Sequence, residues 1–231
     1  MRAHELNKVP DQVILWGGTG QAKVVRPILE HYGAKVVAVF DETPGLPSPF
    51  PDVPIFRGWN GFLQWKADRK PGTVGFCVAI GNPHGRVRLM LHDRLVAEGL
   101  EPLTFAHPTA YIEANAIIGT GTQIMAGAYV GVEASVGMQC IINTKTSIDH
   151  EDAIADGVEL SPGAVLCGSV KIEINAWVCA GSLVLPRVRI GADAIVGAGS
   201  VVTKDVQPGT TVVGVPARPM PGRTGAKAGG A

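Results

Sequence analysis

A six-residue repeat runs without a skip through the second half of this 231-residue chain. Stepping by six meets sixteen positions that are all aliphatic: Ile112, Ile118, Ile124, Val130, Val136, Ile142, Ile148, Ile154, Leu160, Leu166, Ile172, Val178, Val184, Ile190, Val196 and Val202. Four residues after each stands a second position, which is small or β-branched in fifteen cases and charged only at Asp152. Periodicity over this length predicts a repeat architecture rather than an ordinary globular core.

Each hexad predicts a short strand followed by a corner, because six is a multiple of the two-residue period of a strand. Three hexads make one triangular coil, so sixteen of them predict a β-helix of a little over five coils. One coil cannot bury its own face, so both ends of the stack need caps. Because no hexad is skipped, no long loop leaves the prism, and a ligand must bind on its outer walls. Other positions are expected to supply the turn conformations: Gly119, Gly121, Gly131, Gly137, Asn175, Gly191 and Asp193.

Strands alternate with helices in the first hundred residues. Strands are expected over 12–18, 34–42, 53–56, 73–82 and 101–105, and helices over 20–33, 60–67 and 86–100. This alternation predicts a small parallel α/β sheet of Rossmann-like type. We therefore expect an α/β domain over residues 1–106, a β-helix over 107–219 and a disordered, low-complexity tail over 220–231.

A glycine-rich turn, Gly17-Gly18-Thr19-Gly20, follows the first predicted strand. In the register of a dinucleotide-binding fingerprint Gly18 and Gly20 fit, but Lys23 replaces the third glycine, so the fingerprint is incomplete. What remains is a helix N-terminus at the carboxyl edge of a parallel sheet, where ligands commonly bind. The turn and the following Gln21 are thus candidate ligand contacts, and a tight turn without a ligand is the alternative.

Two polar residues end neighbouring strands at the same predicted edge. Asp41 closes the second strand, where a carboxylate suits a sugar hydroxyl, although a solvated turn residue is the alternative. Asn82 closes the next strong strand in a similar position. Both are therefore candidate substrate contacts.

Charge and composition disfavour several classes of function. Twenty basic and twenty acidic residues give zero net charge, so no global field favours nucleic acid or a membrane surface. No apolar run nears the ~18 residues of a membrane span, and the N-terminus lacks the core of a signal peptide. Four scattered cysteines without a CxxC pair are expected to be buried free thiols, which indicates a cytoplasmic protein.

One of the six histidines, His150, lies within the hexads, and three acids surround it: Asp149, Glu151 and Asp152. Carboxylates beside an imidazole favour its cationic form and can orient it as a general base. A surface histidine in an acid-rich turn is the alternative. A zinc site needs several converging ligands, which one histidine and no cysteine pair cannot supply, so no metal is expected.

These features together resemble the NeuD/PglD-like sugar O- and N-acyltransferases, which are hexapeptide-repeat acetyltransferases with left-handed β-helices. The resemblance runs from about Val13 to Met220 and rests on LWGGTGQAKVV, VFDE, AIGN, INTKTSIDHEDAIADGVELSPGAVLCGSVKI and the closing VVGVPARPM. It implies a homotrimer, acetyl-CoA bound between neighbouring β-helices, and a nucleotide-linked amino sugar held by the N-terminal domain.

The resemblance also implies roles for single residues of the β-helix. His150 falls on the catalytic base of the family and Glu151 on the acid beside it. Gly168 falls on the glycine whose backbone N–H faces the acetyl carbonyl. The positions implied to follow the CoA arm are Ala180, Ala198 and Pro216.

Further positions are implied to contact the substrate. Asn143 falls on an asparagine that precedes the catalytic segment, and Asp41 matches an acid near the nucleotide. Two positions depart from the family pattern, because Gln21 and Glu159 stand where relatives often carry histidine. Glu159 is expected near the acetyl group, where it would change substrate orientation or the tuning of the base.

We therefore expect acetyl-CoA-dependent N-acetylation of an amino group on a nucleotide-linked amino sugar. His150 would remove the proton, the amine would attack the thioester directly, and the Gly168 N–H would meet the oxyanion. The nearest alternative is O-acetylation of a sugar hydroxyl, as on sialic acid, by the same site. An alternative of another class is a non-catalytic trimer that binds a sugar nucleotide.

Overall fold

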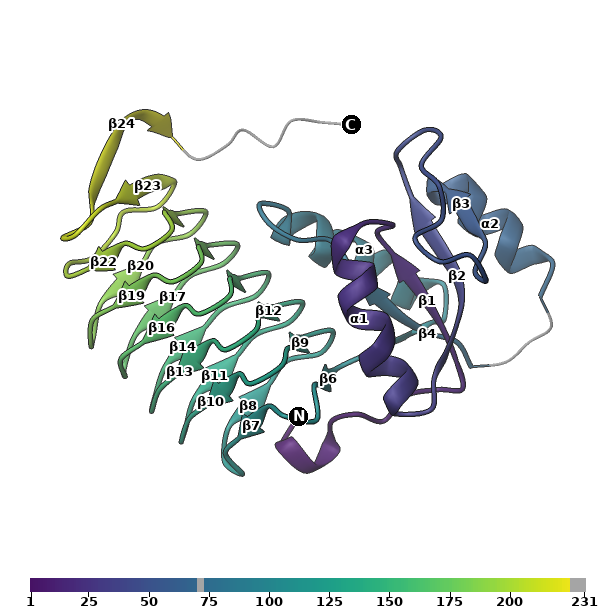
Figure 1. Ribbon diagram of the computed structural model, residues 1–231, viewed down its shortest axis with the longest axis horizontal. Helices are drawn as coiled ribbons and strands as arrows, with labels where there is room; N and C mark the ends of the chain where they lie inside the picture. The colour runs from purple at the N-terminus through teal and green to yellow at the C-terminus, as the bar shows by residue number, and fades with distance from the viewer. Residues whose placement is uncertain (70–72, 225–231) are drawn as a thin grey trace.

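The sixteen hexads form a triangular prism in this computed structural model, which describes residues 1–69 and 73–224 (Figure 1). Each strand from β7 to β22 is two residues long and pairs in parallel with strands three hexads away. The result is the predicted left-handed β-helix with three walls. Fifteen of the sixteen aliphatic positions are buried in one continuous core, and Ile112 packs at its edge.

The three walls are numbered here in chain order. Wall 1 consists of β6 (Phe105–Ala106), β9 (Gln123–Ile124), β12 (Ile141–Ile142), β15 (Glu159–Leu160), β18 (Trp177–Val178), β21 (Ile195–Val196), β23 (Thr210–Val213) and β24 (Arg218–Thr224). Wall 2 consists of β7 (Tyr111–Ile112), β10 (Tyr129–Val130), β13 (Ser147–Ile148), β16 (Val165–Leu166), β19 (Leu183–Val184) and β22 (Val201–Val202). Wall 3 consists of β8 (Ile117–Ile118), β11 (Ser135–Val136), β14 (Ala153–Ile154), β17 (Lys171–Ile172) and β20 (Arg189–Ile190).

The turn conformations expected at Gly121, Asn175 and Asp193 are confirmed, whereas those expected at four other glycines are wrong. From Gly121 to Gly199, every sixth residue has a positive φ, and many of these are not glycine, for example Glu151 at φ 57°. Gly119, Gly131, Gly137 and Gly191 do not belong to this set. A β-carbon on any of them would collide with the backbone of the next coil, so they are small because the coils stack closely there.

The chain itself caps the first coil. The N-terminal ammonium donates to the carbonyl of Ile118, and Leu6, which follows the 3-10 helix Ala3–Glu5, is buried in the prism core. These contacts cover the apolar end that a stack of coils would otherwise expose to water.

The α/β domain has the predicted alternation of strands and helices. Its elements are β1 (Gln12–Trp16), α1 (Gly20–His31), β2 (Lys35–Asp41), β3 (Ile55–Arg57), α2 (Gly58–Ala67), β4 (Gly75–Val78), α3 (Gly85–Ala97) and β5 (Glu101–Pro102). The sheet is parallel in the order β3-β2-β1-β4-β5. Alternate residues of β1 separate two cores: Val13 and Leu15 pack with α1, whereas Ile14 and Trp16 pack with α2 and α3.

The strands expected over 12–18 and 73–82 are shorter in the structure, and two further expectations about elements are wrong. The single strand expected over Glu101–Phe105 is divided, because β5 pairs with β4 while β6 pairs with β9 and joins wall 1. The tail expected to be disordered from residue 220 is strand as far as Thr224, because β24 pairs antiparallel with β23. Residues 225–231 of that tail lie outside the described residues.

A buried arginine on α3 holds the α/β domain against the prism. Arg88 is fully buried, and its Nε and Nη2 donate to the carbonyls of Gln139 and Gly157, at 2.9 and 2.8 Å, on the corner between walls 3 and 1. On the other side, α1 faces the corner between walls 1 and 2. The domain therefore straddles wall 1, and the corner between walls 2 and 3 lies opposite it.

Candidate functional site

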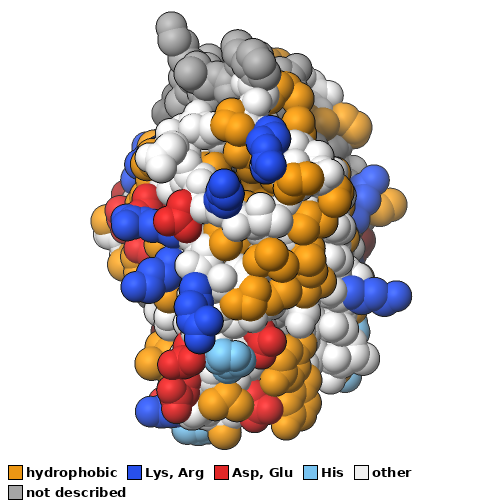
Figure 2. Space-filling model, turned by 90° about the vertical axis from the view of Figure 1, so that its left-hand side faces the viewer, with side chains coloured by type: hydrophobic (Ala, Val, Ile, Leu, Met, Phe, Trp, Pro, Cys, Tyr) orange, Lys and Arg blue, Asp and Glu red, His pale blue; other side chains and the backbone are white. Residues whose placement is uncertain are grey.

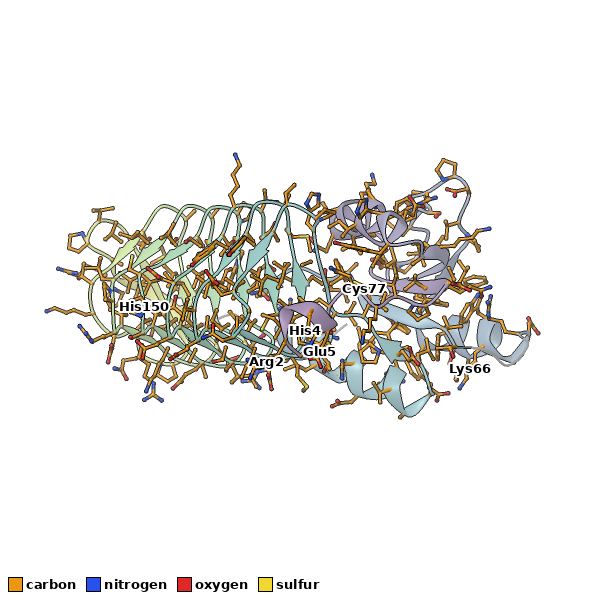
Figure 3. All side chains as sticks on the ribbon, turned by 90° about the horizontal axis from the view of Figure 1, so that it is seen from below. Arg2, His4, Glu5, Lys66, Cys77 and His150 are labelled. Carbon is orange, nitrogen blue, oxygen red and sulfur yellow. The ribbon has the colours of Figure 1, made fainter. Side chains whose placement is uncertain are left out.

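His150 lies on the corner opposite the α/β domain, between β13 and β14. In Figure 3 its label lies in the β-helix on the left, whereas the label of Cys77, which belongs to β4, lies nearer the middle of the view. Its side chain is 56% exposed, and Nδ1 lies 3.1 Å from Glu151 Oε2. The hydroxyl of Ser169 on the next coil donates to the same carboxylate oxygen at 3.3 Å. Glu151 is thus the acid that orients the imidazole.

The other two acids of this segment hold the backbone instead. Asp149 Oδ1 accepts the His150 N–H at 2.7 Å. Asp152 is fully buried, and its two oxygens accept the N–H groups of Asp149 and Val170. Burial raises the pKa of Asp152 to about 6. This carboxyl group therefore fastens the histidine corner to the coil that follows.

Gly168 stands directly beside His150 on the next coil. Its φ is +97°, and a β-carbon at this position would lie 2.7 Å from His150 Nε2. Its carbonyl accepts the Arg187 N–H, but its own N–H has no acceptor among the described residues. An unpaired backbone donor beside an exposed imidazole nitrogen is a suitable arrangement for a developing oxyanion next to a general base.

A pocket of about 680 Å³ opens at the carboxyl ends of β2, β1 and β4. The strand order reverses between β1 and β4, which is where open α/β sheets bind ligands. The pocket is lined by Trp16, Gly17, Thr19, Asp41, Glu42, Ala79, Ile80, Gly81, Asn82, His84, Val87, Met90, Leu91 and Arg94. Three of the predicted substrate contacts, Thr19, Asp41 and Asn82, are among these residues.

The rest of the glycine-rich turn supports this pocket. The Gly18 N–H donates to Asp41 Oδ2 at 2.7 Å, and the Thr43 N–H donates to Oδ1, so Asp41 also shapes the turn. Gly20 is the first residue of α1. Gln21 is not among the lining residues: its Nε2 donates to Gln123 Oε1 on wall 1, at the junction of the two domains.

Glu159 links the pocket to wall 1. Its side chain is nearly buried, and Oε2 accepts the Asn82 N–H at 2.8 Å, while the Ser161 hydroxyl donates to Oε1. Within one chain, Glu159 and His150 lie on wall 1 and on the opposite corner, respectively. A single chain therefore does not bring Glu159 to the imidazole.

The remaining predicted residues lie on the corner between walls 1 and 2. Asn143 follows β12, Ala180 follows β18 and Ala198 follows β21, and both alanines are exposed. Pro216 is exposed between β23 and β24. One chain thus carries the candidate residues on two corners, with wall 2 between them.

Wall 2 is apolar on its outer side. Its outward positions are Tyr111, Tyr129, Ser147, Val165, Leu183 and Val201, and all of them are partly or fully exposed. The rings of Tyr111 and Tyr129 stack with their centroids 6.0 Å apart. Figure 2 shows hydrophobic side chains gathered in a band along this side of the molecule, beside charged residues and a histidine.

Sequence reasoning missed Arg88 and the residues Glu42 and Arg94 of the pocket. Arg88 lies three and seven residues before Leu91 and Leu95, on the face of α3 that is buried. A cation on the apolar face of a helix is a signal that could have identified it. Glu42 and Arg94 carry no comparable signal, because exposed charges are ordinary on a surface.

No membrane-spanning helix and no metal cluster occurs in the part of the chain that the structure describes. None of its helices is both long and apolar enough to cross a bilayer. Nor do three or more His, Cys, Asp or Glu side chains converge there as ligands for a metal ion.

Comparisons with known proteins match both parts of the chain. Residues 12–92 match the PglD N-terminal domain family, and residues 169–204 match the bacterial transferase hexapeptide family. GDP-perosamine N-acetyltransferase of Escherichia coli O157:H7 is 35% identical over 150 residues, which cover 63% of this chain and 67% of that protein.

Solved structures of acetyltransferases also superimpose on this chain. A variant of GDP-perosamine N-acetyltransferase from Caulobacter crescentus, in complex with CoA and GDP-perosamine, superimposes with a TM-score of 0.82 at 31% identity, over 90% of this chain and 96% of that one. The acetyltransferase domain of PglB from Neisseria gonorrhoeae, in complex with acetyl coenzyme A, has a TM-score of 0.80 at 27% identity, over 91% and 99%.

Proposed function

Because the chain belongs to the NeuD/PglD-like family of hexapeptide-repeat acetyltransferases, we propose that it moves the acetyl group of acetyl-CoA onto the amino group of a nucleotide-linked amino sugar. The α/β domain binds the sugar nucleotide and the β-helix performs the transfer. The observation that carries the proposal is that Gly168, whose N–H has no acceptor among the described residues, stands directly beside His150 Nε2. This pair supplies a base and an oxyanion donor at one point, which a non-catalytic scaffold does not need.

His150 Nε2 takes a proton from the sugar amine as its nitrogen attacks the thioester carbonyl. Glu151 accepts the Nδ1–H and stabilises the imidazolium that forms. The carbonyl oxygen becomes an oxyanion that accepts the Gly168 N–H, and such a donor commonly lowers the barrier by ~3 kcal/mol. The tetrahedral adduct then expels the CoA thiolate, which receives the proton from His150. The products are the acetamido sugar and CoA, and no covalent enzyme intermediate is needed.

The site is completed by a second copy of the chain. The pocket adjoins wall 1, whereas His150 lies on the opposite corner, so a sugar held in one chain meets the histidine of a neighbour. The apolar outer side of wall 2, which separates the two corners, is a suitable surface for such an assembly. Closure of the ring as a homotrimer lets every chain offer both corners.

The groove between neighbouring prisms then holds acetyl-CoA. Ala180 and Ala198 are small enough to let the pantetheine arm lie against their corner, and Pro216 borders it near the last coil. Thr19, which lies between Gly18 and Gly20 on the glycine-rich turn, contacts the sugar nucleotide together with Asp41 and Asn82. Asn143 and Glu159 lie toward the neighbour's histidine.

Four free cysteines support a cytoplasmic location, where thiols stay reduced.

The proposal is tested by measuring release of CoA thiol from acetyl-CoA with a panel of UDP-, GDP- and dTDP-linked amino sugars. We expect turnover with an amino sugar, none with the matching hydroxyl sugar, and loss of turnover in His150→Ala. The melting temperature and the oligomeric state of the variant, by light scattering, should stay unchanged. Near-normal turnover by a folded His150→Ala protein, or transfer to hydroxyls alone, would contradict the proposal.

A further inference from the structure

The pocket of the α/β domain has two distinguishable ends. At the β4 end, Asn82 is bonded to Glu159 of the prism. At the β2 end lies Glu42, and Figure 1 shows β2, β3 and α2 on the side of the domain away from the prism. Because β1 separates β2 from β4, the two ends lie roughly 10 Å apart. If the amino sugar is acetylated against the prism, as proposed above, the nucleobase occupies the end that contains Glu42.

Glu42 is exposed, and its carboxylate makes no hydrogen bond to the described residues. It rests against Gly58, the first residue of α2, so closely that a β-carbon on Gly58 would overlap it. The partial positive charge of the N-terminus of α2 favours a carboxylate here. The neighbouring Asp41 differs, because both of its oxygens already accept backbone N–H groups. Glu42 thus presents two free acceptor oxygens in the pocket.

Arg94 offers a flat surface at the same end. Its guanidinium lies over the ring of Trp59, 3.7 Å from the ring centroid, and it also lines the pocket. Trp59 in turn packs against Trp16, with ring centroids 5.5 Å apart. Nucleobases stack on guanidinium planes and aromatic rings of this kind. A planar ligand is thereby favoured beside the free carboxylate.

Two adjacent acceptor oxygens distinguish the nucleobases by the donors and acceptors that each base carries on its edge. Guanine carries two neighbouring donors, N1–H and the N2 amino group, which match a carboxylate in a bidentate pair. Uracil and thymine have one N–H between two carbonyl oxygens, and those oxygens would face the carboxylate. In adenine and cytosine an acceptor nitrogen stands beside the amino group. Guanine therefore makes two charge-assisted hydrogen bonds where the other bases make at most one.

We propose that Glu42 reads the Watson–Crick edge of guanine and makes this protein specific for a GDP-linked amino sugar. The proposal rests on the function proposed above and narrows its substrate class. A good bidentate pair distinguishes a base by about 10- to 100-fold in affinity.

Calorimetric titration of the full-length protein with free nucleoside diphosphates tests this without any transfer reaction. GDP should bind at least tenfold more tightly than UDP, ADP or dTDP. Glu42→Gln, which replaces one acceptor by a donor, should weaken GDP by about 10- to 100-fold and leave UDP nearly unchanged. Inosine diphosphate, which lacks the N2 amino group, should bind the wild type more weakly than GDP, and this difference should vanish in Glu42→Gln.

Glu101→Gln is the matched control, because Glu101 is an exposed acid on β5 outside this pocket. It should leave all four affinities unchanged, and the melting temperatures of both variants should match the wild type. GDP binding within twofold of wild type in a folded Glu42→Gln protein, or equal affinity of the wild type for UDP, would overturn the proposal. Selective GDP binding without acetyl transfer would instead contradict only the proposed function, and efficient acetylation of a UDP-linked amino sugar would contradict only the assignment of Glu42.

Discussion

Gly168 and His150 stand so close together on adjacent coils that a β-carbon on the glycine would lie 2.7 Å from His150 Nε2. This contact brings the proposed base and the proposed oxyanion donor together at one corner of the prism. The glycine leaves room for the imidazole, and its N–H has no acceptor among the described residues. The proposed catalytic pair is thus produced by the stacking of coils, not by neighbours in sequence.

Replacement of Gly168 by alanine should lower kcat by about 100-fold or more, because the new methyl group displaces the imidazole. The left-handed backbone should also cost about 1–2 kcal/mol of unfolding free energy. Gly33→Ala is the matched control: its φ is +87° and nothing lies within 4 Å of its β-carbon, so it should lose stability but keep kcat. Steady-state kinetics and urea unfolding measure the two effects. Equal kcat values for the two variants would contradict the steric argument.

Replacement of Glu151 by glutamine should lower kcat roughly tenfold or more with KM almost unchanged, because an amide stabilises the imidazolium less than a carboxylate does. Ser169→Ala removes the second contact of the same carboxylate and should lower kcat by no more than about fivefold. Kinetics at saturating acetyl-CoA provide the comparison. A larger effect for Ser169→Ala than for Glu151→Gln would refute the role given to Glu151.

Asp152 should make the stability of the chain depend on pH. Burial raises its pKa from 3.8 to about 6, so between these values the native state binds more protons than the unfolded state. Stability must therefore fall as pH rises through this window, by about 3 kcal/mol at most. Urea unfolding at pH 4.0, 5.5 and 7.0 should show this loss in the wild type and its absence in Asp152→Asn.

A second measurement of Asp152 is independent of folding. Its carboxyl carbon, followed by NMR in the native protein, should titrate near pH 6. Parallel stability profiles for the wild type and Asp152→Asn, or titration near the ordinary value of 3.8, would show that the buried group remains ionised.

Mixed oligomers should reveal that each site uses two chains. His150→Ala lacks the base, and Thr19→Trp fills the pocket, so each variant alone should be inactive. A random mixture of both should recover roughly a quarter of wild-type activity, because that share of sites pairs an intact pocket with an intact histidine. Co-expression with two purification tags, followed by the thiol assay, measures the recovery. Verified mixed oligomers without activity would show that the pocket and His150 act within one chain.

The repeat could be predicted because its information is local: each aliphatic position from Ile118 onward is buried as the period requires. The place of Phe105–Ala106 in wall 1 escaped prediction, because nothing in the strand expected over 101–105 marks the end that pairs with β9. The left-handed corners at Gly121, Asn175 and Asp193 were predicted, because these residue types favour a positive φ. Glu151 escaped prediction, since its residue type has no such preference.

The candidate site likewise has some features that a local sequence pattern reveals and others that depend on long-range contacts. His150 and its neighbours are recognisable in sequence, whereas the placement of the pocket opposite them depends on how α3 docks through Arg88. Such docking is set by contacts between residues 51 and 69 positions apart, for which no local pattern exists.

The buried guanidinium of Arg88 also sets the separation between the pocket and the prism. It bonds the loop of the pocket, through the carbonyl of Ile80 and the side chain of Asn82, and the corner of the prism, through Gln139 and Gly157. In the proposed reaction, these bonds set the distance between the pocket and the prism. The base, the diphosphate and the sugar ring of the proposed substrate would together have to span that distance, and the amino group would have to stand at the ring position where it ends.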